Sequence, residues 1–200
     1  HDHTGGITKL SSTVKDLPVI GPRGGHISGI TKSVAQGDLV KLPLIGCEFN
    51  VLELPGHTLD HIAFLGHNAL FCGDTLFSAG CGRLFVGTPG QMHRSLNKIK
   101  RLPASTVIYC THEYTQANVN FALAAEPDNQ ALQAYDSWVK ETRAQNTPTL
   151  PTLLSTQLDI NPFLRCDSPA IKKSVASQSD AELIDEIAVF THLRQWKDNF

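Results

Sequence analysis

Carboxylate and imidazole side chains occur where apolar segments of this chain meet turns. The positions are Asp2, His3, His57, Asp74 and His112. Imidazole and carboxylate groups are ligands that suit zinc, iron or manganese. A bound divalent cation polarises a carbonyl group and lowers the pKa of water until hydroxide forms near neutral pH. The set therefore indicates metal-assisted hydrolysis.

Short apolar runs would bring these distant positions together. Residues 49–54 alternate like a strand and end before His57, residues 69–72 end before Asp74, and residues 107–110 end before His112. A single histidine or aspartate in a loop is more often a cap or a surface residue. Here a potential ligand follows each of three predicted strands, and this repetition favours one shared site at the end of a sheet.

The remaining pattern predicts a mixed fold. Residues 66–68 form a hairpin loop between strands, and residues 147–165, rich in proline and threonine, form an extended connection. The helical signals are Thr88 as N-cap of a helix that Pro103 stops, helical spacing beyond Tyr114 with Asp128 as a second cap, and a capping box at 179–182.

Composition excludes several classes of protein. The chain has 200 residues, of which 41% are hydrophobic, so it can bury a core. Its 17 Lys plus Arg nearly balance 19 Asp plus Glu, which argues against a nucleic-acid partner. The five cysteines contain no Cys-x-x-Cys pair, and we expect a reducing compartment, the cytoplasm or alternatively the mitochondrion. No apolar run approaches the roughly 18 residues of a membrane span.

Several motifs together resemble one family. The combination is similar to the metallo-β-lactamase superfamily, and within it to the hydroxyacylglutathione hydrolases (glyoxalase II). The resemblance runs along the whole chain, and its motifs are Asp2-His3 before Gly5-Gly6, Pro55-Gly56-His57-Thr58, Gly73-Asp74-Thr75, Ala79-Gly80-Cys81-Gly82-Arg83, Thr111-His112-Glu113-Tyr114, Asn161-Pro162-Phe163 and Arg194-Gln195-Trp196-Lys197.

The resemblance implies an α+β fold in two parts. Residues 1–114 would form a metallo-β-lactamase-like αββα sandwich that is incomplete at its N-terminus. Residues 115–200 would form a helical glutathione-binding domain. The family's metal motif has two more histidines, so we expect a preceding segment of roughly 50 residues that ends in His-x-His. That segment would cover apolar surface around Val51 and Phe71.

The resemblance also implies a binuclear metal site. Asp2, His3 and His112 would hold one divalent ion, His57 would help to hold the other, and Asp74 would bridge them. Asp2 and Asp74 would thereby serve catalysis. We expect zinc, with iron and manganese as alternatives. His61 would orient the site without binding metal.

The implied substrate is an anionic glutathione thioester, S-lactoylglutathione, cleaved to glutathione and lactate in methylglyoxal detoxification. Arg194 and Lys197 would share one helix face toward it. Arg83 stands at a family lysine, Phe85 at a tyrosine of some relatives, and Tyr114 would supply a phenolic hydrogen bond. We expect a monomer with this small-molecule partner and without a nucleic-acid or membrane partner.

Two alternatives remain open at this stage. A persulfide dioxygenase or another superfamily member would share Asp74 and His112, but it would lack the helical tail with Arg194 and Lys197. A truncated, catalytically silent metal-binding protein would hold at most one ion per chain, whereas the hydrolase would hold about two.

Overall fold

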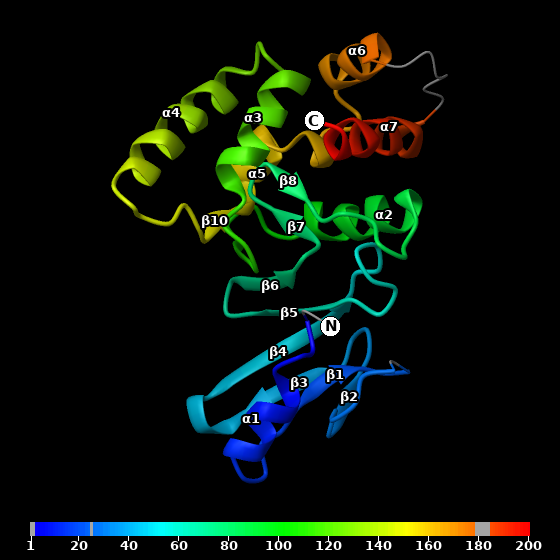
Figure 1. Ribbon diagram of the computed structural model, residues 1–200, viewed down its shortest axis with the longest axis vertical. Helices are drawn as coiled ribbons and strands as arrows, with labels where there is room; N and C mark the ends of the chain where they lie inside the picture. Colours follow the sequence, from blue (N-terminus) through cyan, green and yellow to red (C-terminus); the bar gives the residue numbers. More distant parts are fainter. Residues whose placement is uncertain (1–2, 25, 179–184) are drawn as a thin grey trace.

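The computed structural model describes residues 3–24, 26–178 and 185–200. A central sheet separates two regions in Figure 1. Helices from the second half of the chain lie on one side, and the short elements of the first 40 residues lie on the other. Of the predicted ligands, Asp2 lies outside the described residues.

The main sheet has the strand order β10-β9-β6-β5-β4-β3, and all neighbours are antiparallel except β6 and β9. Its strands are β3 (Leu39–Leu42), β4 (Cys47–Glu53), β5 (Ile62–Gly66), β6 (Ala69–Gly73), β9 (Val107–Cys110) and β10 (Thr152–Leu153). Two smaller sheets pair β1 (Ile20–Pro22) with β2 (Lys32–Val34) and β7 (Leu76–Phe77) with β8 (Gly80–Cys81).

The helices are α1 (Ile7–Thr13), α2 (Pro89–Lys100), α3 (Thr115–Ala125), α4 (Gln130–Ala144), α5 (Leu154–Ile160), α6 (Pro169–Gln178) and α7 (Glu186–Asp198), with 3-10 turns η1 (Pro43–Ile45) and η2 (Pro162–Leu164). The segment between β6 and β9 contains β7, β8 and α2. Because β6 and β9 are parallel, this crossover carries the chain back to the same end of the sheet.

The predicted strands around the site are confirmed, and so is their hairpin. His67 and Asn68 both have positive φ, 52° and 58°, between the paired residues Gly66 and Ala69. This is the backbone of a type I′ turn, which matches the twist of the strands beside it.

The helix signals are confirmed in part. Thr88 and Gln91 form the capping box of α2, with Pro89 at its first position. The cap of α4 is Asn129 and not Asp128, because the Asn129 side chain accepts a hydrogen bond from the Leu132 N–H. The predicted capping box at 179–182 lies outside the described residues, and α7 begins at Glu186.

The prediction of an extended segment over residues 147–165 holds as far as the short strand β10 but is wrong from Leu154 onward, where the chain forms α5 and η2. Proline and threonine suppress a helical signal in the sequence, yet Leu154 and Ile160 of α5 are fully buried against the rest of the protein. Tertiary burial therefore outweighs weak local propensity here.

One hydrophobic core joins both halves of the chain. Leu70 and Ile108 of the sheet share a cluster with Leu96 of α2, Phe121 of α3 and Phe190 of α7. A fully buried side chain of this size contributes about 1.5–3 kcal/mol. The core therefore holds the C-terminal helices against the sheet that carries the predicted ligands.

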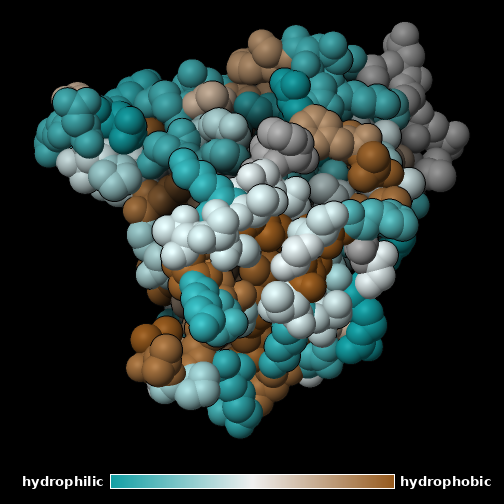
Figure 2. Space-filling view, turned by 60° about the horizontal axis from the view of Figure 1, so that its bottom comes forward, coloured by the Kyte–Doolittle hydropathy of each residue, from teal (hydrophilic) through white to brown (hydrophobic). Residues whose placement is uncertain are grey.

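The other face of the sheet is covered unevenly. Val51 is fully buried with Val34 and Val40, so the expectation that it lies on uncovered surface is wrong. Phe71 is 43% exposed and stacks on Tyr109, with ring centroids 4.9 Å apart. Figure 2 shows hydrophobic side chains at the surface of the lower part of the molecule. No helix among the described residues is long and apolar enough to cross a membrane.

Candidate metal and substrate site

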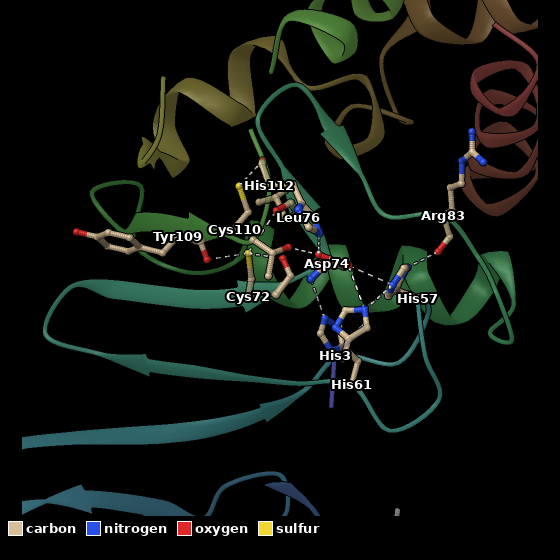
Figure 3. A network of polar contacts seen from close by, with 12 residues as sticks. His3, His57, His61, Cys72, Asp74, Leu76, Arg83, Tyr109, Cys110 and His112 are labelled. Carbon is tan, nitrogen blue, oxygen red and sulfur yellow. Dashed lines mark hydrogen bonds and ion pairs between the residues drawn. The ribbon is translucent and has the colours of Figure 1, made fainter. Parts of the chain in front are cut away.

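Three predicted ligands converge on one point. The Nε2 atoms of His3 and His57 lie 3.2 Å apart, and each lies 3.2 Å from Oδ2 of Asp74. Figure 3 shows the two imidazoles facing the same carboxylate from different loops. His57 and Asp74 are buried, whereas His3 is exposed. The structure therefore brings together residues that are up to 71 positions apart in the chain.

The backbone fixes which nitrogen of His57 faces the cluster. Its Nδ1 lies 2.8 Å from the carbonyl oxygen of Arg83. A carbonyl oxygen only accepts, so Nδ1 carries a proton, and in the neutral ring Nε2 is then the unprotonated nitrogen that faces Asp74. This is the tautomer that a neutral histidine needs in order to bind a metal ion through Nε2.

Asp74 depends on Gly73 and His61. Gly73 has φ of +53°, and a Cβ at this position would overlap the His61 imidazole. The backbone N–H of Asp74 donates to His61 Nε2 over 3.0 Å. Because the Nε2 lone pair of His61 accepts this bond, it is not available to a metal ion. This supports a role for His61 in orienting the site. Burial, together with the neighbouring His57, lowers the pKa of His61 and keeps this ring neutral.

His112 approaches the second oxygen of the same carboxylate. Its Nε2 lies 3.7 Å from Oδ1 of Asp74, and the Thr111 hydroxyl donates to that oxygen. His3 thus shares Oδ2 with His57, while His112 lies at Oδ1. The resemblance implied instead that His3 and His112 serve one ion, and the distribution of ligands between two ions stays a prediction.

The donor set fits a divalent cation. Two imidazole nitrogens and one carboxylate oxygen lie within 4.8 Å of one another. Such a group of lone pairs is stabilised by a positive charge at its centre. The nearby cysteines are unsuited to act as nucleophiles, because burial raises the pKa of Cys72 to about 12 and that of Cys110 to about 11.

A cavity of about 630 Å³ opens beside this cluster. His57, Asp74 and His112 line one part of it. All five predicted substrate residues line the same cavity, namely Arg83, Phe85, Tyr114, Arg194 and Lys197. The phenol ring of Tyr114 stacks on the His112 imidazole with centroids 4.9 Å apart, so the aromatic and metal-binding parts of the site are in contact.

The two predicted cations of α7 differ in their surroundings. Arg194 is 4% exposed; it donates to the carbonyl oxygen of Cys81 over 3.0 Å and pairs with Asp198 at 3.0 Å. Lys197 donates to the carbonyl oxygen of Ala117, and burial, with a smaller effect of Arg194, lowers its pKa to about 8. The two terminal nitrogens of Arg194 are thus bonded within the protein, whereas its buried Nε has no hydrogen-bond partner among the described residues. Lys197 is a cation that loses its proton more readily than an ordinary lysine.

The sequence analysis did not identify several residues of the site, among them Thr111 and Asn118. Thr111 bonds to Asp74, and Asn118 lines the cavity while its amide donates to the Ser78 carbonyl oxygen over 3.0 Å. Thr111 directly precedes the predicted ligand His112, and this position could have indicated that it belongs to the site. Asn118 lies within a helical pattern, and only the packing of α3 on β8 brings it to the cavity.

Two solved structures share the fold of this chain. The B3 metallo-β-lactamase BLEG-1 aligns over 82% of this chain and 72% of its own, with a TM-score of 0.55 and 19% identity. A protein named TTHA1623, solved in a di-iron-bound form, aligns over the same fractions with a TM-score of 0.53 and 22% identity. The likeness at this level of identity establishes the metallo-β-lactamase fold.

Comparison with known sequences identifies the family within this superfamily. Residues 1–112 match the metallo-beta-lactamase superfamily, and residues 113–200 match the hydroxyacylglutathione hydrolase C-terminus. Hydroxyacylglutathione hydrolases of Shewanella denitrificans and Photobacterium profundum are 50% and 52% identical over all 200 residues, which span 78% of each relative. The chain belongs to the hydroxyacylglutathione hydrolase family, as its motifs predicted. Membership of the superfamily implies a dinuclear metal site.

Proposed function

We propose that the protein hydrolyses S-2-hydroxyacylglutathione thioesters, with S-lactoylglutathione as substrate, to glutathione and a 2-hydroxy acid, in methylglyoxal detoxification. One observation carries the proposal. Three of the predicted metal ligands, His57, Asp74 and His112, line the same cavity as Arg83 and Lys197. A thioester carbonyl can therefore lie at the cluster while the carboxylates of its glutathionyl part reach cations.

His3, His57, Asp74 and His112 would hold the metal ions, with Asp2 as the further ligand that the resemblance implies. Bound divalent cations supply a hydroxide nucleophile and polarise the thioester carbonyl. Within the chain, Asp74 offers one oxygen to each side of the cluster. His61 holds the Asp74 backbone, and the Arg83 carbonyl holds His57 in the required tautomer.

The leaving group needs little help from the protein. A thiol has a pKa near 8.5, so the glutathione thiolate leaves without a dedicated general acid. This agrees with the cavity, where the described lining includes Tyr114 and Cys81 but no buried carboxylic acid other than Asp74. Burial raises the pKa of Cys81, which makes this thiol a poor proton donor and, because little thiolate forms, a poor nucleophile.

Recognition of glutathione would be divided between direct and indirect contacts. Lys197 and Arg83 would pair with substrate carboxylates, and Tyr114 would donate a hydrogen bond. Phe85 packs against His57 with ring centroids 4.8 Å apart, so it would contribute apolar contact without a hydroxyl. Arg194 would act mainly by holding the Cys81 carbonyl at the cavity wall.

We further propose zinc as the metal, with iron and manganese as alternatives, and a monomeric, cytoplasmic protein. Residues 1–114 would form the metal-binding part and residues 115–200 the glutathione-binding part. The cavity lining supports this division, because its metal donors His57, Asp74 and His112 belong to the first part and Lys197 belongs to the second.

The decisive experiment measures S-lactoylglutathione hydrolysis by the purified protein together with its metal content. Hydrolysis with about two ions per chain would support the proposal. At most one ion and no turnover would favour the catalytically silent alternative. Oxygen consumption with a glutathione persulfide in place of hydrolysis would favour the dioxygenase.

A further inference from the structure

The hairpin formed by β7 and β8 connects the metal cluster with the substrate cavity. It begins two residues after Asp74, and its last residue, Cys81, offers the carbonyl oxygen that Arg194 binds. The Phe77 ring contacts Tyr114 at 5.3 Å and His112 at 6.1 Å between centroids. The position of this hairpin therefore determines how the Tyr114 and His112 rings are supported at the cavity.

The turn of the hairpin adopts a conformation that its sequence disfavours. Ala79 is fully buried and has φ of +54°. A residue with a Cβ loses about 1–2 kcal/mol in this left-handed region. Its backbone N–H donates to Oε1 of Gln157 over 2.7 Å. A side chain 78 residues away thus stabilises the turn.

Asn161 holds the two strands of the same hairpin. Its Nδ2 donates to the carbonyl oxygens of Phe77 at 3.1 Å and Gly80 at 3.0 Å. Its Oδ1 accepts from the Phe163 N–H, which fixes the orientation of the amide. Gln157 and Asn161 are both 0% exposed, so water cannot replace these bonds without opening the core.

We propose that Gln157 and Asn161 are positioning residues for the glutathione thioester. Their side-chain amides hold the β7–β8 hairpin in the one arrangement that supports Tyr114 and His112 through Phe77 and presents the Cys81 carbonyl to Arg194. They touch neither substrate nor metal. The inference rests on the proposed function for the identity of the ligand, and it assigns a role to the Asn161-Pro162-Phe163 motif.

The test compares three variants for binding of S-hexylglutathione, a thioether that cannot be hydrolysed. Asn161→Ser keeps an oxygen that can cap η2 but removes both bonds to the hairpin. Gln157→Leu removes the bonds to the Ala79 N–H and the Ser78 hydroxyl, together with those to Thr152 and Asn161. Asn129→Ser is the matched control, because Asn129 also caps a helix but bonds to Glu126 and to the Asp159 carbonyl instead of the hairpin.

We expect the Kd for the thioether to rise roughly tenfold in Asn161→Ser and in Gln157→Leu. The reason is that a displaced hairpin should weaken binding by about the net free energy of one hydrogen bond. The KM for S-lactoylglutathione should rise in parallel, with a smaller fall in kcat. Asn129→Ser should lower Tm while leaving Kd within about twofold of the unchanged protein.

A lower Tm with unchanged Kd in both hairpin variants would overturn the proposal, and so would failure of both variants to fold, because the amides would then serve stability alone. The proposed function fails separately, if the unchanged protein binds the thioether but hydrolyses no thioester. Absence of binding by the unchanged protein would reject both.

Discussion

The Cα of Gly82 lies against the carbonyl oxygen of Asp74, closer than any side chain would allow. A Cβ on Gly82 would overlap that oxygen and would also meet Nδ1 of His57 at 3.3 Å. The neighbouring backbone bond, from the Gly82 N–H to the Thr75 carbonyl oxygen, is 3.3 Å long. The segment that follows β8 and lines the substrate cavity is thus packed directly on the backbone of a predicted metal ligand.

Gly82→Ala should therefore lower metal content and activity together. The added methyl group must displace either the Asp74 backbone or the His57 ring, and a shift of the backbone costs considerable free energy. Metal analysis of the purified variant checks this. Gly90→Ala is the control, because its Cβ would meet the flexible end of Arg94 at 3.3 Å and otherwise only make ordinary van der Waals contact with Ile187 at 3.8 Å. Full metal content in Gly82→Ala would show that the loop relaxes freely.

Asp74→Asn should lose far more activity than stability. An amide keeps the shape of the side chain but removes the negative charge between three imidazoles. We expect kcat to fall by more than about 100-fold, beyond the range for an outer-sphere partner. Kinetics and thermal unfolding measured on the same preparation check this. Asp128→Asn, on an exposed carboxylate, should change neither, and unchanged turnover in Asp74→Asn would refute its role as a bridging ligand.

Replacing Arg194 and Lys197 separately should give different results. Arg194→Ala removes the donor to the Cys81 carbonyl in a buried setting, so we expect about 2 kcal/mol lower unfolding free energy as well as a higher KM. Lys197→Ala should raise KM with kcat nearly intact, because it removes binding that ground state and transition state share. Denaturant unfolding combined with steady-state kinetics distinguishes them. Equal stability of the two variants would contradict the structural role of Arg194.

Binding of the substrate should weaken as the pH rises through about 8. Lys197 has its pKa lowered to about 8, chiefly by burial. The ammonium that attracts a carboxylate is present below this pH and is lost above it, whereas an ordinary lysine would stay charged to about 10.4. The Kd for S-hexylglutathione measured from pH 6.5 to 9.5 checks this. In Lys197→Arg the dependence should disappear over the same range, and a pH-independent Kd in the unchanged protein would argue against Lys197 as a ligand.

Local patterns in the sequence determined those parts of the fold that depend on interactions between residues close together in the chain. Alternation in β4, the two-residue turn at His67 and Asn68, and the capping box of α2 depend on neighbours within a few positions. The family followed from motifs spread over the chain, because each motif combines a strand end with a particular side chain. The same information predicted that His57, Asp74 and His112 end strands of one sheet.

Only the tertiary structure decided which atoms meet. It placed His3 beside His57 on one oxygen of Asp74, buried Arg194 against Cys81, and folded residues 154–164 into α5 and η2 in place of an extended connection. These outcomes depend on burial and on hydrogen bonds between residues as far as 113 positions apart. A buried amide such as that of Asn161 can lower its free energy only by finding partners in space, and sequence spacing carries no record of which backbone carbonyls will be there.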